Sequence, residues 1–310
     1  MKGLSQDPVS RSFLLLLIIV AVASSGVSAV SNGGFDSAWV ADWLRQLSLE
    51  IIGALITFIG FDLIAGRRIR RDEERHEMEG LVRQAQLGIP DAIQELRRQG
   101  RLAGQNFAKA RWDKVSMEGC NLQSINLERA SLREAFLEEV ALQNANLDYA
   151  NLENANLRAS NLTGASLNWI NAPSITLVRA NLTDATLQEA NLSHANLRWA
   201  ILHRAHLESA RLQNANMHDV NLIEANLQEA DLQLARLAKA DLRGAYMQEC
   251  DLQGASLLRA DLRGANLTFA ILFDATLDHA LLDETTILPD GKPWKPAVDM
   301  RRFTDPTYRR

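Results

Sequence analysis

A large side chain recurs at every fifth residue over most of this chain, and that spacing limits the possible folds more than any other feature. The series begins with Phe107 and Trp112 and continues without an insertion or deletion to Leu282 and Ile287. It comprises thirty-seven pentads, and only the one centred on Ala172 lacks a large apolar residue at this position. An α-helix could not bury the series on one face, because each fifth side chain is rotated by about 140° from the last.

Each pentad also places a small residue two positions before the large one, as in Ala145-Asn146-Leu147 and Ala190-Asn191-Leu192. This is the spacing of a strand, in which the two apolar residues point inward and the residue between them points outward. The next two residues are mostly polar and must turn the chain. Short extended segments that turn every five residues close most simply into a coil, and the coils stack into a β-solenoid.

This tandem pattern of A-[ND]-L-x-x resembles the pentapeptide-repeat proteins, in a membrane-anchored variant, and the resemblance covers roughly 60% of the chain. It implies an all-β solenoid over residues 105–288, namely a right-handed quadrilateral β-helix of about nine coils, preceded by transmembrane and neck helices. The family has four pentads in each coil, so residues twenty apart are expected to be stacked neighbours.

The exceptional pentad at Ala172 has isoleucine on both sides, at Ile170 and Ile175, where the repeat normally has alanine, and Pro173 follows directly. Exchanging large and small residues at adjacent inward positions can conserve the volume of the core. We therefore predict a locally repacked corner. A functional kink or binding notch is the alternative.

The first hydrophobic stretch, Phe13 to Val30, contains no charge and follows Lys2 and Arg11. It is long enough for a transmembrane helix. It also suits a signal peptide, because Val27-Ser28-Ala29 resembles a cleavage site with small residues. Together with an external loop it forms a predicted N-terminal segment, residues 1–46, and whether it is cleaved or retained stays open.

The second hydrophobic stretch, Leu47 to Gly66, contains only two charged residues, Glu50 and Asp62. We predict a transmembrane helix over residues 47–66. Its cytoplasmic side is marked by the arginines that follow, because loops on that side are rich in basic residues. These are Arg67, Arg68, Arg70 and Arg71. The solenoid is therefore expected to face the cytoplasm at a bacterial plasma membrane, whether or not the first segment is removed.

Residues 67–104 are predicted to form a helical neck with a break at Gly88-Ile89-Pro90. The second neck helix, Asp91 to Gln99, is the expected N-terminal cap, because a solenoid must cover the edges and core of its first coil. At the other end, Pro289-Asp290-Gly291 predicts a turn into a C-terminal tail, residues 289–310.

Several apolar residues near the C-terminal end occupy positions that the repeat turns outward. The tail covers them, or they form a homodimer interface. The resemblance implies that an interface is feasible, because the C-terminal coil mediates dimerisation in several family members. The residues are Tyr246, Phe269, Ile271, Phe273 and Leu281.

One candidate surface for protein binding follows from the twenty-residue coil. Tyr149 and Trp169 are twenty residues apart and are expected to stack on one edge, while Glu189, Glu229 and Glu249 continue the same line. An aromatic pair beside an acidic ribbon is typical of a protein-docking strip. Scattered variation of the repeat surface would produce a similar arrangement, and this alternative stays open.

The sequence indicates no catalysis, cofactor or metal. The histidines of the solenoid fall at different phases of the coil, so no two of them stack as metal ligands would. We find no nucleophile elbow, Walker loop or dinucleotide fingerprint. Cys120 and Cys250 both occupy the small inward position on opposite faces, so a disulfide between them is excluded.

The net charge of the solenoid helps to choose among the possible non-catalytic functions. The solenoid has 23 Asp and Glu against 15 Lys and Arg, a net charge near −8 that disfavours nucleic-acid binding. The leading hypothesis is a non-catalytic, membrane-anchored scaffold that presents a cytoplasmic rod to an unknown protein. Because the family includes quinolone-resistance proteins that resemble DNA and bind gyrase, a DNA mimic acting on DNA gyrase or topoisomerase is an alternative. A third hypothesis makes the membrane hairpin the active element and the solenoid a spacer.

Overall fold

The computed structural model describes the backbone of residues 37–308, with side chains at 53, 56, 57, 59–61 and 63–308. The chain divides into two compact units, Met1–Glu79 and Gly80–Arg310. The helices of the described part are α2 (Ser37–Gln86), α3 (Pro90–Arg98) and α4 (Arg301–Thr304). The predicted segment Phe13 to Val30 and the side chain of Asp62 lie outside the described residues.

Helix α2 extends farther than the sequence predicted. It begins at Ser37, so residues 37–46 are helical although they were expected to belong to an external loop, and it continues through Gly66 into the neck. The reason is that this stretch contains no proline, and isolated glycines cost a long helix only about 1 kcal/mol each. Among the residues whose side chains are described, no helix combines the length and apolar character that membrane crossing requires.

The break between α2 and α3 depends on a glycine. Gly88 adopts a φ of +81°, and a Cβ at this position would lie 2.2 Å from the carbonyl oxygen of Arg111. Pro90 then starts α3 at the position where its missing N–H is tolerated. Only glycine therefore fits this close approach between the neck and the first coils.

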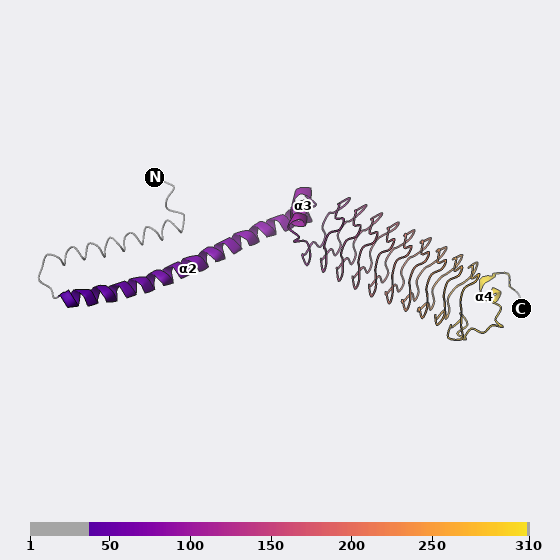
Figure 1. The fold of residues 1–310 in the computed structure, drawn as a ribbon. Coiled ribbons are helices and arrows are strands. Elements are labelled where there is room, and N and C mark those ends of the chain that lie inside the picture. The colour runs from indigo at the N-terminus through magenta and orange to yellow at the C-terminus, as the bar shows by residue number, and fades with distance from the viewer. Residues whose placement is uncertain (1–36, 309–310) are drawn as a thin grey trace. The chain divides into compact units, whose positions relative to one another are not determined.

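Helix α3 packs against the N-terminal end of the solenoid, beside the first turns in Figure 1. The guanidinium of Arg97 donates to the carbonyl oxygens of Ser116, at 3.4 Å, and Glu118, at 3.1 Å. Three apolar side chains of α3 are buried: Ala92, Ile93 and Leu96.

Two aromatic residues fill the first coil beneath this helix. The ring centroids of Phe107 and Trp112 lie 4.8 Å apart, and both side chains are buried. The indole N–H of Trp112 donates to the carbonyl oxygen of Ala85 at 2.8 Å, in the last turn of α2. The N-terminal end of the core is thus closed by two large aromatic side chains. Their one polar atom, the indole nitrogen of Trp112, has a hydrogen-bond partner.

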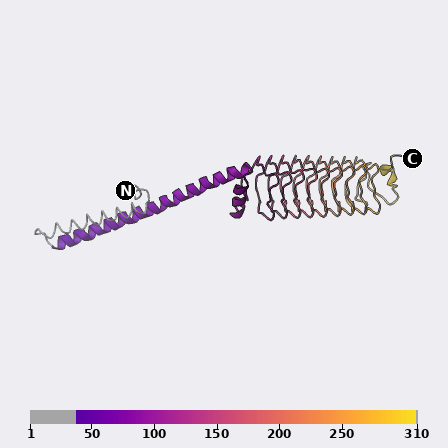
Figure 2. The same cartoon turned by 90° about the horizontal axis from the view of Figure 1, so that it is seen from above.

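The solenoid is built from parallel pairs that lie twenty residues apart. Asn126, for example, is bridged in parallel to Asn106 and to Asn146. Four pentads therefore make one coil, and Figures 1 and 2 show the coils stacked along a single axis. Within the described residues each pentad contributes one bridge residue and no longer strand.

Backbone hydrogen bonds join most pentads to the next coil and close their turns. The N–H of Leu127 donates to Asn146 O at 2.7 Å, and that of Arg129 donates to Asp148 O at 2.8 Å. The N–H of Ala130 returns to Leu127 O at 2.9 Å, which closes a four-residue turn. Arg129 has a φ of 57°, and a positive φ at this third position is typical of a type II turn.

The turn also explains why asparagine or aspartate follows the small inward residue. The side-chain oxygen of Asn126 accepts the N–H of Glu128 at 3.0 Å, and Asn146 does the same for Asp148 at 3.0 Å. This local bond satisfies a backbone donor as the chain leaves the bridge. The outward residue of the pattern thus stabilises the turn.

The exceptional pentad keeps the geometry of its neighbours. Asn171 is bridged to both Asn151 and Asn191, one coil to each side. Ile170, Ala172 and Ile175 are all buried. The exchange of large and small side chains therefore repacks the corner, as predicted, and opens no notch.

The regular spacing ends one pentad earlier than predicted. Asp261 and Leu281 are twenty residues apart, but the next bridge joins Asn266 to Ile287, which are twenty-one apart. The prediction of an uninterrupted series to Ile287 is therefore wrong in the last pentad. One residue is inserted, and the inward positions become Thr286 and Leu288, both buried.

The C-terminal tail packs on this last coil. Ile287 forms an antiparallel bridge to Pro293, and the N–H of Trp294 donates to Thr286 O at 2.8 Å. Beyond it, α4 is fixed by the N–H of Asp274, which donates to Thr304 O at 2.7 Å. The tail therefore supplies hydrogen-bond partners to part of the final turns.

Burial predicts how single substitutions in the solenoid affect stability. We expect Leu197→Ala to lower the free energy of unfolding by about 2–5 kcal/mol, because Leu197 is fully buried and truncation leaves a cavity. The measurement is urea unfolding of the full chain followed by circular dichroism.

Leu234→Ala is the matched control, because Leu234 is 57% exposed at a turn position. This variant should change the unfolding free energy by no more than about 0.5 kcal/mol. Equal effects of the two substitutions would contradict the inward and outward assignment.

Candidate functional site

The residue that ends each pentad lies at a corner of the coil, and twenty-residue pairing aligns these residues into columns. We call the column that contains Trp169 the Trp169 corner. Its members adopt positive φ angles between 53° and 61°. They are Lys109, Arg129, Tyr149, Trp169, Glu189, Ser209, Glu229, Glu249 and Phe269.

Tyr149 and Trp169 stack on this corner, as the sequence predicted. Their ring centroids are 4.9 Å apart, and their planes differ by 6°. Both rings stay accessible, with 47% and 41% of their surfaces exposed. Each residue is fixed by its own N–H, which donates to the next coil at 2.9 Å, to Asn168 O and Gln188 O. The pair is therefore a preformed aromatic platform on rigid backbone.

Charge changes sign on the two sides of this platform. The guanidinium of Arg129 lies over the ring of Tyr149, 5.2 Å from its centroid. On the other side Glu189, Glu229 and Glu249 are exposed, and the hydroxyl of Ser209 donates to Glu229 at 3.4 Å. The Trp169 corner thus runs from basic through aromatic to acidic.

A second aromatic site was missed by the sequence analysis. Trp199 is 41% exposed, with Arg198 4.1 Å and Arg179 5.5 Å from its ring centroid. The signal was available, because Arg179 and Trp199 are twenty residues apart, just as Tyr149 and Trp169 are. We call this column the Trp199 corner: Gly119, Glu139, Ala159, Arg179, Trp199, Asp219, Lys239, Arg259 and His279.

The side of the solenoid next to the Trp199 corner is also basic. It contains a shallow hollow of about 410 Å³, in which two guanidinium groups and one imidazole line the wall. The lining residues are Arg198, Asn216, His218, Arg236, Ala238 and Ser256. Basic groups therefore lie together in this hollow, although the solenoid as a whole carries a net negative charge.

The apolar residues predicted to cluster near the C-terminal end do not form one cluster. Phe269, Ile271 and Phe273 are consecutive outward residues and are 70%, 41% and 46% exposed. Leu281 lies ten residues from Ile271, which is half a coil, so it is on the opposite side. Tyr246 lies one coil before Asn266, in the pentad stacked on the one that ends at Phe269.

The tail does not cover these residues, although it packs on the last coil. Leu281 and Tyr246 are 52% and 51% exposed, and Phe269 is the most exposed of the five. The covering role predicted for the tail is therefore wrong for these side chains. The homodimer interface stays a prediction.

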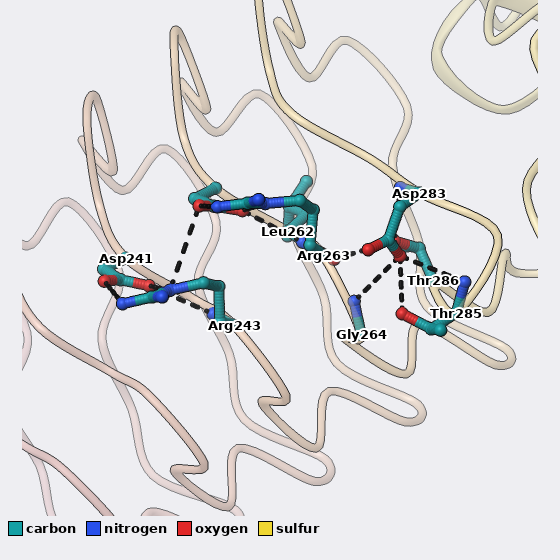
Figure 3. Close-up of polar contacts among 9 residues, drawn as sticks. Asp241, Arg243, Leu262, Arg263, Gly264, Asp283, Thr285 and Thr286 are labelled. Carbon is teal, nitrogen blue, oxygen red and sulfur yellow. Dashed lines mark hydrogen bonds and ion pairs between the residues drawn. The ribbon is translucent and has the colours of Figure 1, made fainter.

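An ion-pair ladder links the last coils (Figure 3). Arg243 donates to both carboxylate oxygens of Asp241, at 2.8 and 2.7 Å, and its Nε lies 3.9 Å from Asp261. Arg263 donates to both oxygens of Asp261, at 2.9 and 2.6 Å. The hydrogen bonds from Arg263 lower the pKa of Asp261. Each bidentate pair joins residues two apart within one coil and is geometrically specific. The contact of 3.9 Å between Arg243 and Asp261 is the link from one coil to the next.

Asp283 stabilises the inserted residue at the end of this ladder (Figure 3). One of its carboxylate oxygens accepts the N–H of Thr285 at 3.0 Å, its hydroxyl at 2.5 Å, and the N–H of Gly264 at 3.4 Å. These bonds, first that from the hydroxyl of Thr285, lower the pKa of Asp283. The hydroxyl of Thr286 in turn donates to Leu262 O at 3.0 Å.

The two cysteines are free thiols in different surroundings. Burial raises the pKa of Cys250 to about 12, so this thiol stays protonated and unreactive. Cys120 is only partly buried, and its pKa is raised by burial against the opposing effect of Arg97. Over residues with described side chains, no three His, Cys, Asp or Glu groups converge on a position for a metal ion.

Coils of four pentads, filled by leucine and alanine and joined by parallel bridges, define a quadrilateral β-solenoid. A family model described as pentapeptide repeats matches eight copies, in residues 135–171, 174–204, 200–238 and 240–278. The chain belongs to the pentapeptide-repeat family, whose members fold as right-handed quadrilateral β-helices.

Among solved structures, HetL from the cyanobacterium Nostoc sp. strain PCC 7120 is 33% identical. The match covers 62% of this chain and 89% of HetL, with a TM-score of 0.39. HetL is described as involved in the regulation of heterocyst differentiation.

Two further structures show the range of the family. Rfr23 from Cyanothece 51142 is 40% identical over 32% of this chain and 64% of its own, with a TM-score of 0.23. QnrB1, a plasmid-mediated fluoroquinolone resistance protein, is 19% identical over 59% and 89% of the two chains, with a TM-score of 0.28. A search of curated protein sequences found no match.

The contacts of Asp283 predict a local pH effect. Because its pKa is lowered in the folded chain, its contribution to stability is complete above the ordinary aspartate pKa of about 3.9 and is lost as the pH falls through the lower folded value. We expect Asp283→Ala to remove this contribution and to accelerate amide hydrogen exchange at Gly264 and in the last coil at pH 7.

Asp278→Ala is the matched control, because Asp278 is exposed and its carboxylate makes no polar contact with the described residues. Its exchange rates should equal those of the unmodified chain. If Asp283→Ala left exchange in the last coil unchanged, the role of this carboxylate in holding the inserted residue would be disproved.

Proposed function

We propose that this protein is a non-catalytic, membrane-anchored scaffold that presents the Trp169 corner to a protein partner in the cytoplasm of a bacterium. The observation that supports this function best is the stacked, accessible pair of Tyr149 and Trp169. Most of the other outward positions in the repeat are polar, so an exposed aromatic platform is an exception in need of an explanation.

The platform has the physical properties of a binding hot spot. Aromatic side chains offer a large apolar contact area, and rings already held in a stack lose little conformational freedom on binding. The acidic residues Glu189, Glu229 and Glu249 lie to one side of the pair and Arg129 to the other. Such a charge gradient would orient a partner and favour one of the two possible directions along the corner.

The anchor is proposed from the sequence of residues 47–66 and from the residues that follow it. Ile56, Phe61, Leu63 and Ile64 are 66%, 74%, 59% and 67% exposed on α2, and such side chains are costly in water. The arginines after Gly66 supply the basic flank expected on the cytoplasmic side of a membrane segment. Lipid would solvate the apolar part of this helix.

The interior of the solenoid supports a role in binding over a role in catalysis. The inward positions are filled by leucine and alanine that are almost completely buried, so the stacked coils leave no room for a substrate. A DNA mimic would present continuous negative charge, whereas here Arg179, Lys239 and Arg259 interrupt it on the Trp199 corner. The distribution of charge therefore favours a protein-binding surface over DNA mimicry.

Substitution of the platform tests this function. We expect Trp169→Ala combined with Tyr149→Ala to weaken capture of a partner about tenfold or more, because truncating an aromatic hot spot costs about 2 kcal/mol or more. The measurement is crosslinking of the full chain in native bacterial membranes, followed by quantitative mass spectrometry of the captured proteins.

Phe136→Ala is the matched control, because Phe136 is an aromatic residue with 53% exposure outside the Trp169 corner. It should leave capture unchanged. A second comparison removes residues 1–66, which should abolish the membrane-dependent partners. Gyrase captured equally with and without these residues, and inhibition of its supercoiling activity by the purified chain, would replace the scaffold with DNA mimicry.

A further inference from the structure

We propose that the Trp169 corner binds the Trp199 corner of a second copy of this chain, so that parallel copies associate side by side. This inference names a partner for the proposed docking surface and therefore rests on the proposed function. It follows from a match in charge and in size between two columns on opposite corners of one solenoid.

The two corners are opposite each other and have the same repeat. A coil contains twenty residues, so positions ten apart in sequence lie half a coil apart. Trp169 and Arg179, or Glu249 and Arg259, are pairs of this kind. Because coils are about 4.8 Å apart, the members of such a pair differ in height along the axis by only about 2.4 Å. Two parallel copies placed side by side therefore bring these positions together.

Opposite charges meet in this parallel alignment. Near the N-terminal end, Arg129 of one copy faces Glu139 of the other. In the middle Glu189 faces Arg179, and toward the C-terminal end Glu249 lies between the heights of Lys239 and Arg259. All these side chains are exposed in the single chain.

Glu229 has one attractive neighbour and one repulsive neighbour on the facing corner, and the repulsive one is the only unfavourable charge contact in the alignment. Glu229 lies between the heights of Lys239, an attractive neighbour, and Asp219, a repulsive one. The carboxylate of Asp219 is 2.6 Å from Nδ1 of His218, so one of its oxygens is already engaged within its own chain. The alignment therefore contains attractive pairs near both ends and in the middle, with one unfavourable position.

The sizes of the side chains match as well as their charges. The stacked rings of Tyr149 and Trp169 span the height of Ala159 on the facing corner, where the repeat leaves space. Conversely, Trp199 lies half a coil from the level of Ser209 along the axis, so this large ring faces a small side chain. Arg179, already near the ring of Trp199, also lies next to the height of Trp169 and could contact its face.

The contact is heterologous, because one corner binds a different corner of the next copy. Each copy keeps a free Trp169 corner or Trp199 corner, so association extends into a row instead of closing as a dimer. Exposed ion pairs contribute little individually and are screened by salt. Anchoring in one membrane orients the copies alike and raises their effective concentration, which strengthens a weak contact.

Zero-length crosslinking provides a specific readout. A carbodiimide joins a lysine amine to a carboxylate that contacts it, and Lys239 is half a coil from Glu229 and Glu249 within one chain, on the opposite corner. A crosslinked peptide that joins Lys239 to either glutamate can therefore arise only between copies. We expect this peptide, and a ladder of oligomers, from the full chain in native membranes at low salt.

Charge reversal tests the pairing of the two corners. The first variant combines Glu189→Lys, Glu229→Lys and Glu249→Lys, and the second combines Arg179→Glu, Lys239→Glu and Arg259→Glu. Each variant alone presents two corners of like charge. The amount of crosslinked oligomer should therefore fall at least tenfold. A mixture of the two presents opposite charges at every contact and should restore it.

The outcomes separate this inference from the proposed function. Circular dichroism first establishes that both variants fold, as expected for exposed positions. Loss of the ladder with each variant and its return in the mixture supports the row. If the unmodified chain gives no copy-to-copy link, or if its copy-to-copy links involve only carboxylates next to Phe269, Ile271 and Phe273, such as Asp274, the inference is overturned. The proposed function would still stand if Trp169-dependent capture of another protein persisted.

Discussion

Parallel pairing between residues twenty apart is the interaction on which every other feature of this solenoid depends. Each bridge residue of the inner coils pairs with both neighbouring coils, and the hydrogen bonds of about 2.7–3.0 Å repeat almost without change. This pairing holds the corner residues at positive φ, a conformation that costs a non-glycine side chain free energy. The strain is tolerated because the next coil accepts the N–H of the same residue.

The same pairing explains why function and stability are separated in this chain. The inward positions are restricted to leucine, alanine and similar residues, because the coil has a constant cross-section. The two turn positions have no such restriction, so their side chains can vary without loss of the fold. Aromatic stacks and charge gradients on the corners can therefore change independently of the core.

Much of the fold could be predicted from sequence because it is local and repetitive. The positions of Leu127 and Ala130 recur in every coil with the same environment. A five-residue pattern was therefore sufficient to assign such residues to the core. The inserted residue could not be assigned in this way. Leu281-Leu282 and Ile287-Leu288 offer an apolar residue in either register, and the choice depends on the bonds of Asp283 and Thr286 to the preceding coil.

The candidate site was predictable to the extent that it follows the twenty-residue period. The stack of Tyr149 and Trp169 was found because both members are aromatic. Trp199 was missed because its partners are arginines, which are common at the polar turn positions of the repeat. The clustering expected around Ile271 failed for a related reason: residues near in sequence can lie on opposite sides of a coil, so proximity along the chain does not indicate a shared surface.

The closed ends of the solenoid direct association to its sides. At the first coil Trp112, Phe107 and the buried face of α3 cover the core, and at the last coil the bridge from Ile287 to Pro293 pairs an edge that would otherwise stay open. An unpaired edge is the usual route by which β-solenoids stack end to end. With the first coil covered and part of the last coil paired to the tail, the accessible corners are the principal surfaces for recognition. A chain whose corners differ in charge, as these do, can then distinguish one side of a neighbour from the other.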